Sequence, residues 1–213
     1  ESKNSKMPGA LSQEGLERSI DTVMNANDLV SHPKNVVQGT QTKRLVTLEG
    51  EGAKQGKSNM FDALKLAPTA LRTLRYAVND VTKKGRLYAN RRLRMLHMGD
   101  GFDRKNIFHE LAHHVEYSDE RLYEANQAFI ASRTTGPPRP LKELIGDQYD
   151  AKEMAYPGRF ITPYAAKICP GKATEVFSIG FEMFSDKARL TKFRKQDPEH
   201  FNLIFGYLMG KYN

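Results

Sequence analysis

One short segment, NIFHELAHHVEY at residues 106–117, constrains the fold of this chain more than any other. It holds three of the six histidines and two glutamates, and Asp103 just before it is a good N-cap for a helix over residues 104–117. At about 3.6 residues per turn, such a helix gathers five apolar side chains on one arc: Ile107, Phe108, Leu111, Ala112 and Val115. An apolar arc of this width is typical of a helix that packs against a core.

His109 and His113 lie beside this arc, four residues apart, so their imidazoles are one turn apart and can bind one metal ion. Glu110 points to the side, near the same ion but not obliged to bind it. This H-E-x-x-H pattern is typical of two zinc ligands with a carboxylate that takes a proton from the bound water. The alternative is a solvated, histidine-rich helix face. His114 turns towards the apolar arc and is interpreted as a packed or hydrogen-bonded histidine.

A catalytic zinc site usually has a third protein ligand and one position left for water. The residues after the motif lack the glycine and further histidine that one class of site requires. Asp147 and Asp150 are weak candidates, and Glu175 in ATEVFSIGFEMF is favoured. Glu182 lies on the same helical face but two turns away, roughly 11 Å along the axis, so one ion cannot reach both glutamates without a bend. Glu182 is then either a hydrogen-bond acceptor that orients a metal ligand, or a charged residue at the surface.

HELAHH followed by TEVFS resembles the gluzincin branch of zinc metallopeptidases, in which the glutamate of an E-x-x-S/D segment is the third ligand. The resemblance implies that His109, His113 and Glu175 bind Zn²⁺. It also implies that Glu110 is the general base. Some members have an acid at the position of Ile179 that orients the first histidine, so another residue or a backbone carbonyl must take that role here.

Tyr164, in the segment ahead of Glu175, is a candidate oxyanion donor, because gluzincins often place a tyrosine or histidine opposite the base. A buried structural tyrosine is the alternative. Three segments within residues 100–213 are also similar to a metallopeptidase-like domain of phage and prophage head-morphogenesis or minor head proteins: RFITPYAAKI, ATEVFSIGFEMFSD and DPEHFNLIFGYLMG. That likeness implies phage structural proteins as partners, beside a protein or peptide substrate.

The overall charge favours acidic partners. The net charge is +8 and the pI is near 9.5, which would suit nucleic acid or an acidic substrate, although Lys and Arg are spread along the chain. Cys169 is the only cysteine, so no internal disulfide forms, which fits a reducing compartment. No apolar run approaches the roughly twenty residues of a membrane span, and no signal peptide opens the chain. We expect a cytoplasmic or virion-associated protein without a membrane partner.

The expected fold class is α+β, mainly helical, with a small mixed sheet in a zincin-like arrangement. Residues 1–58 are predicted to be an arm or appendage, and residues 59–213 the metallopeptidase domain. A helix interrupted at Pro68 is predicted between Asn59 and Gly85. RLYANRRLRMLHMG is read as a strand or hairpin, with its RLRMLHM part as the edge strand that binds the substrate backbone.

The leading hypothesis is therefore a zinc-dependent peptidase. The alternative from another class is a zinc-stabilised structural or DNA-associated virion protein without turnover, and a helical protein without metal is the third. Glu110 separates the first two, since a purely structural site does not need it, and a closed site with four ligands would favour the second.

Overall fold

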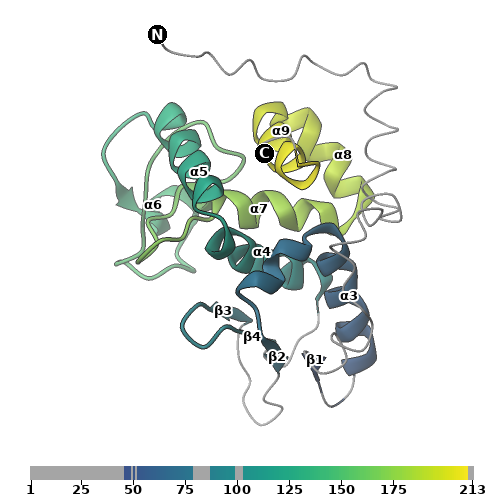
Figure 1. Ribbon diagram of the computed structural model, residues 1–213. Coiled ribbons are helices and arrows are strands. Elements are labelled where there is room, and N and C mark those ends of the chain that lie inside the picture. The colour runs from purple at the N-terminus through teal and green to yellow at the C-terminus, as the bar shows by residue number, and fades with distance from the viewer. Residues whose placement is uncertain (1–45, 49, 51, 79–86, 99–102, 211–213) are drawn as a thin grey trace.

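Helix α4 (Arg104–Ser118) lies at the centre of the fold, with a small sheet and helix α3 (Ala53–Leu66) on one side and helices α7 (Val176–Glu182), α8 (Lys187–Gln196) and α9 (Pro198–Leu208) on the other (Figure 1). The computed structural model describes residues 46–48, 50, 52–78, 87–98 and 103–210. The other α-helices of these residues are α5 (Glu120–Arg133) and α6 (Leu141–Ile145). Short 3₁₀ helices span Pro68–Arg72, Pro163–Ala166 and Met183–Ser185.

Helix α4 begins at the predicted N-cap, and its predicted apolar face is buried. The Asp103 carboxylate accepts a hydrogen bond from the backbone N–H of Asn106 at 3.2 Å, which satisfies one of the free donors of the first turn. The five side chains of the apolar arc are all fully buried. They face α3, α7 and the first 3₁₀ helix, which contact α4 from both halves of the chain. The next helix, α5, begins in the same way with Asp119 as its N-cap.

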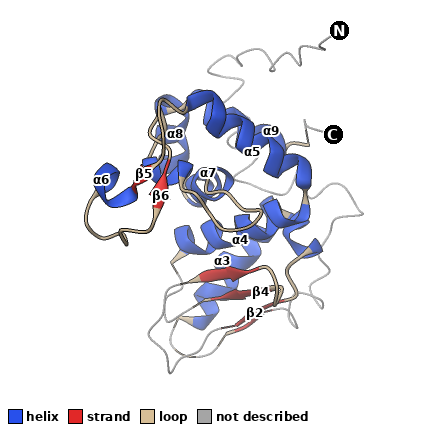
Figure 2. Ribbon diagram, turned by 90° about the vertical axis from the view of Figure 1, so that its left-hand side faces the viewer, coloured by secondary structure: helices blue, strands red, loops and turns tan. Residues whose placement is uncertain are grey.

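The sheet is small and mixed, which confirms the α+β class with a mainly helical chain. Its strand order is β1-β2-β4-β3, with β1, β2 and β4 parallel and β3 antiparallel to β4. The strands are β1 (Val46–Thr47), β2 (Tyr76–Val78), β3 (Tyr88–Asn90) and β4 (Met95–His97). Strands β5 (Arg139–Pro140) and β6 (Met154–Ala155) form a separate antiparallel pair. Figure 2 shows α3 and α4 on one side of the larger sheet.

Two predictions for this half of the chain are wrong. Between Pro68 and Val78 the predicted helix does not resume as an α-helix: one 3₁₀ segment follows, and then Tyr76–Val78 forms β2 between β1 and β4. The last part of the predicted helix, residues 79–84, lies outside the described residues. Ala77 is buried while Tyr76 is exposed, the alternation of a strand. The RLRMLHM segment is not an edge strand either, because β4 lies between β2 and β3, and β3 forms the edge among the strands that the structure describes.

The opposite half is held by aromatic packing around α7. Five phenylalanines from α7, α8, α9 and the turn between them are almost completely buried and meet ring to ring: Phe177, Phe181, Phe184, Phe193 and Phe201. Burying each such side chain stabilises the fold by about 1.5–3 kcal/mol. Gly180 lets α7 and α9 approach closely, because a Cβ at this position would overlap the Ile204 side chain. The start of α7 is thereby fixed beside α4.

The division of the chain at residue 58 stays a prediction, and residues 1–45 lie outside the described part. Within the described part, β1 and the first turn of α3 precede residue 58, and β1 pairs with β2. None of the helices in the described ranges is long and apolar enough to cross a membrane.

Candidate metal centre

Two adjacent elements bring the three predicted ligands together. His109 and His113 project from α4, and Glu175 is the N-cap residue of α7, the helix that packs most extensively on α4. One donor atom of each residue lies within 4.8 Å of the others. The Nε2 atoms of His109 and His113 are 3.1 and 3.5 Å from the same carboxylate oxygen, Glu175 Oε2. All three side chains are buried, so this group could hold a metal ion away from bulk water.

The Glu175 carboxylate is held on both of its oxygens. Ser178, one turn later, donates its hydroxyl to Oε2 at 2.7 Å, and the Cys169 thiol donates to Oε1 at 3.6 Å. Burial by itself would raise the pKa of Glu175, but His113, His109 and the Ser178 hydrogen bond together lower it to about 2. Burial and the nearby Glu175 raise the pKa of Cys169 to about 12, so this thiol stays neutral. The group therefore presents an ionised carboxylate to its two imidazoles.

Glu182 is the partner that orients His109. Its Oε2 lies 2.9 Å from His109 Nδ1, and its Oε1 lies 3.3 Å from Lys105 Nζ. The side chain is buried, so of the two interpretations of Glu182 the acceptor is confirmed and the surface charge is wrong. Burial lowers the pKa of His109, but the hydrogen bonds to Glu175 and Glu182 outweigh it and raise the pKa to about 10. Glu182, about one helical turn after Ile179, thus provides the carboxylate that some gluzincins have at the position of Ile179.

A second buried carboxylate, Glu116, joins the other end of the group to the chain before α7. Its oxygens accept hydrogen bonds from the Thr174 N–H at 2.8 Å, the Thr174 hydroxyl at 2.6 Å and the Asn126 amide at 2.6 Å. Thr174 immediately precedes Glu175, so these bonds fix the backbone that presents the carboxylate ligand. Sequence reasoning missed Glu116. Its position three residues after His113, on the same face of the helix, was the available signal.

Glu110 and Tyr164 line one cavity of about 420 Å³ together with His109. Glu110 Oε2 accepts a hydrogen bond from the backbone N–H of Ala89 on β3 at 2.9 Å. The Tyr164 ring lies 6.3 Å from the His109 ring, and Lys167 Nζ donates to the Tyr164 hydroxyl at 3.4 Å. Both predicted catalytic side chains therefore adjoin the metal group, and Lys167 is a neighbour of Tyr164 that the sequence did not suggest.

The remaining candidates lie elsewhere. His114 is fully buried, with Nε2 3.0 Å from the Met95 carbonyl oxygen and Nδ1 3.3 Å from the Thr73 hydroxyl, which confirms a structural histidine. Burial lowers its pKa to about 4. Asp147 and Asp150 are exposed and do not belong to the metal group.

Comparisons with protein-family models, with curated proteins and with solved structures find no match for this chain. What stands is a buried His-His-Glu group in an α+β fold, whose three donors could hold a metal ion.

Proposed function

We propose that this chain is a zinc-dependent peptidase. The observation that supports the proposal best is the juxtaposition of His109, His113 and Glu175 with Glu110, which does not belong to the group but lines the cavity that begins at His109. Two imidazoles and a carboxylate are one of the donor sets that catalytic zinc takes, with a further position left for water. The same donors also suit iron, but a glutamate directly after the first histidine favours hydrolysis.

The side chains around the group have distinct roles in this proposal. Zinc bound there would lower the pKa of a water molecule to about 7. Glu110 would accept the proton of a water molecule held there and pass it to the amine that leaves. Tyr164 donates its hydroxyl to the substrate carbonyl oxygen as negative charge develops, and the Lys167 ammonium beside that hydroxyl favours this charge. Glu182 keeps the His109 ring in place.

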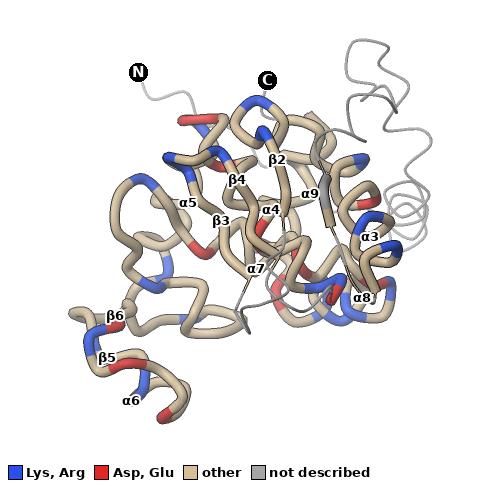
Figure 3. Tube along the Cα trace, turned by 90° about the horizontal axis from the view of Figure 1, so that it is seen from below, with Lys and Arg blue, Asp and Glu red and all other residues tan. Residues whose placement is uncertain are grey.

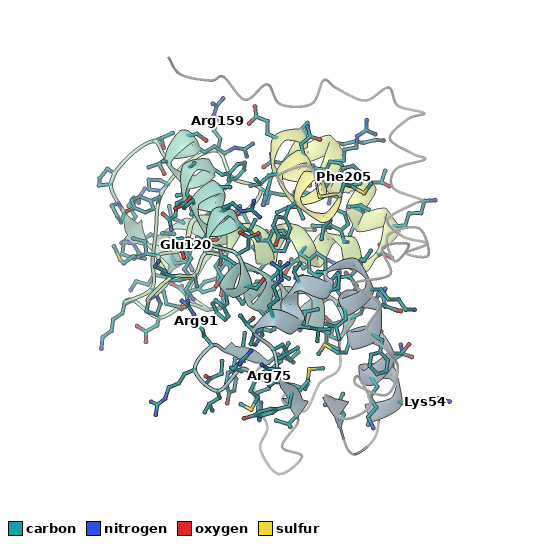
Figure 4. The ribbon with its side chains drawn as sticks, viewed as in Figure 1. Lys54, Arg75, Arg91, Glu120, Arg159 and Phe205 are labelled. Atoms are coloured by element: carbon teal, nitrogen blue, oxygen red, sulfur yellow. The ribbon has the colours of Figure 1, made fainter. Side chains whose placement is uncertain are left out.

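The edge strand β3 supports a peptide as the substrate. The Ala89 N–H, bonded to Glu110, points away from β4 and towards the open side of the sheet. An extended peptide can add to such an edge through main-chain hydrogen bonds. Arg91, at the turn after β3, lies over the Tyr117 ring at the end of α4, 5.4 Å from its centroid (Figure 4). This cation would favour acidic segments at the His113 end of the group.

Metal content is the first test. Elemental analysis of the purified protein should find about one zinc per chain, lost in His109→Ala and in His113→Ala. His97→Ala is the matched control, because His97 stacks on Tyr88 of β3 outside the metal group, and it should keep the zinc. Zinc at full stoichiometry in both ligand variants would refute the proposal.

Turnover is the second test, measured by mass spectrometry on a mixture of unstructured peptides. Glu110→Gln should keep zinc and fold, since its amide oxygen still accepts the Ala89 N–H, but lose about 10²- to 10⁴-fold in rate. Glu143→Gln, on the exposed side of α6, should cleave like the parent. Equal rates for the parent and Glu110→Gln would exclude this base. Zinc without any cleavage would favour the alternative of a zinc-stabilised structural protein.

The natural substrate and partners are a further part of the proposal. The likeness of three segments to phage head proteins favours a virion structural protein as substrate, and the net charge of +8 is compatible with a location near nucleic acid.

A further inference from the structure

The cavity beside the metal group extends from only one end of it. His109 and Glu110 line this cavity, whereas His113 and Glu175 do not. Its volume of about 420 Å³ lies in the range, roughly 300–1,000 Å³, of pockets that hold small ligands. If the chain is a peptidase, the side chain of a substrate residue next to the cleaved bond would lie in this cavity.

The walls of the cavity suit the aliphatic part of a side chain. They come from five separate stretches of the chain, so the cavity is formed by the fold rather than by one loop. The apolar lining residues are Leu87, Ile161, Ile179 and Met183, with the rings of Tyr149 and Tyr164. Leu87 and Ile179 are buried, which fixes two of these walls.

Among the described residues, the charges around the cavity leave one cation without a carboxylate partner. Both oxygens of Glu182 are engaged, one by His109 and the other by Lys105. Arg189, in the first turn of α8, is exposed and also lines the cavity, so it lies at the opening. No carboxylate of the described chain forms a salt bridge with its guanidinium. Figure 3 shows α8 among the segments with several Lys and Arg residues.

We propose that this cavity selects a substrate residue with a carboxylate at the end of a short aliphatic chain, bound by Arg189. This inference rests on the proposed peptidase function and names the class of substrate. The aliphatic part packs on the apolar walls, and the guanidinium forms paired hydrogen bonds with the carboxylate. The carboxylate belongs to a glutamate side chain or to the end of the peptide, and the test below separates the two sources.

Small metal-binding ligands test the cavity without any need for turnover. Each ligand has a hydroxamate, which chelates the metal, and an adjacent side chain that is Glu, Gln, Leu or Lys, with a neutral methylamide end. A further Leu ligand has a free carboxylate end. Dissociation constants are measured by calorimetry with zinc-loaded parent, Arg189→Glu and Lys192→Glu. Lys192 is an exposed residue of the same helix that does not line the cavity, so its variant is a matched charge reversal.

We expect the Glu ligand to bind the parent about tenfold more tightly than the Gln ligand, as a charge-assisted pair would give. Arg189→Glu should remove this preference and favour the Lys ligand, while Lys192→Glu should keep it. A tenfold gain for the Leu ligand with the free end, also lost in Arg189→Glu, would support the carboxylate site and identify the peptide end as its source.

Equal, zinc-dependent affinity of all the ligands would overturn the inference and leave the metal site intact. A preference for the Glu ligand that survives in Arg189→Glu would also overturn it. A parent that binds neither zinc nor any hydroxamate would overturn the proposed function, and the inference with it.

Discussion

His109 and His113 lie one turn apart on the same helix, but the surroundings of their outer ring nitrogens differ. His109 Nδ1 lies 2.9 Å from a Glu182 oxygen. His113 Nδ1 is buried and has no hydrogen-bond partner among the residues that the structure describes, and its ring stacks on Tyr117 with centroids 6.2 Å apart. Burial lowers the pKa of His113, whereas the two carboxylates raise that of His109. One imidazole is oriented by a charge and the other by packing.

This difference shows two ways to position a proposed metal ligand within one small site. At the His109 end, a carboxylate orients the imidazole directly. At the His113 end, the Glu116 carboxylate bonds to Thr174 and so positions the backbone next to Glu175. Removing the first carboxylate should therefore affect the metal, and removing the second should affect mainly the fold.

The largest effect on metal binding is expected at Glu175, the N-cap of α7, in comparison with Glu182, the last residue of that helix. Glu175→Ala should lose most of the bound zinc, because it removes a charged ligand from a dication, while Glu182→Ala should retain a weaker site. Titration of both variants against a competing chelator measures the difference. Loss of the metal in Glu182→Ala with parental affinity in Glu175→Ala would show that the ligand has been assigned to the wrong residue.

A smaller effect is expected when only the charge of Glu182 is removed. Glu182→Gln can still accept the His109 hydrogen bond but no longer supports it with a negative charge, so zinc affinity should fall by about 10- to 100-fold. The same chelator competition measures the affinity, with Glu143→Gln as the exposed control. Parental affinity in Glu182→Gln would mean that packing orients both histidines.

Glu116→Gln should change stability more than metal binding. A glutamine places its amide N–H₂ among the donors of Thr174 and Asn126, which leaves a buried donor without an acceptor and costs about 1–3 kcal/mol. Urea unfolding of the metal-free protein measures the change in the free energy of unfolding. A loss of zinc affinity greater than that of Glu182→Gln would contradict the division between the two ends.

The last prediction concerns the effect of acid on stability, and it involves a histidine outside the metal group, where no effect on metal binding is expected. His200 donates its Nε2–H to the Val176 carbonyl oxygen, and burial lowers its pKa to about 4, against about 6.5 in an unfolded chain. Between these values the unfolded chain binds a proton that the folded protein does not, so the stabilisation present above pH 6.5 is lost as the pH falls towards 4. His200→Gln should lessen this loss.

Thermal unfolding of the metal-free protein between pH 7 and 4 checks the acid prediction. His109 acts in the opposite direction near the top of this window, because its pKa of about 10 keeps it protonated when folded, while the unfolded residue takes up its proton as the pH falls through about 6.5. Its contribution is the same in the parent and in His200→Gln, so the comparison of the two isolates His200. An acid loss that is unchanged in His200→Gln would locate the sensitive group elsewhere.

The sequence predicted α4 and the pairing of its two histidines well, because the information is local. The Asp103 cap, the apolar arc and the spacing of His109 and His113 all lie within fifteen residues or so, and helical periodicity alone brings them into register. Glu175 needed a long-range assumption, and the resemblance to gluzincins supplied it. The zinc itself and the roles of Glu110 and Tyr164 stay predictions.

The features that the sequence did not predict depend on contacts between residues that are far apart in the sequence. Strand β2 forms because β1 and β4 lie on either side of it, and nothing within Tyr76–Val78 requires a strand rather than a helix. The edge position of β3 depends on strand order, which a hairpin pattern does not specify. The hydrogen bonds between Glu116 and Thr174 join residues 58 positions apart in the sequence.

The hydrogen bond between the Ala89 N–H and the Glu110 carboxylate predicts that the rate of cleavage depends on the length of the substrate. A backbone N–H serves one strong acceptor at a time, and in the resting protein the Ala89 N–H is shared with the proposed base. A peptide long enough to pair with β3 competes for that N–H and frees a lone pair on Glu110. Cleavage should therefore accelerate with peptide length until pairing reaches Ala89 and then level off, and a rate independent of length would contradict this competition.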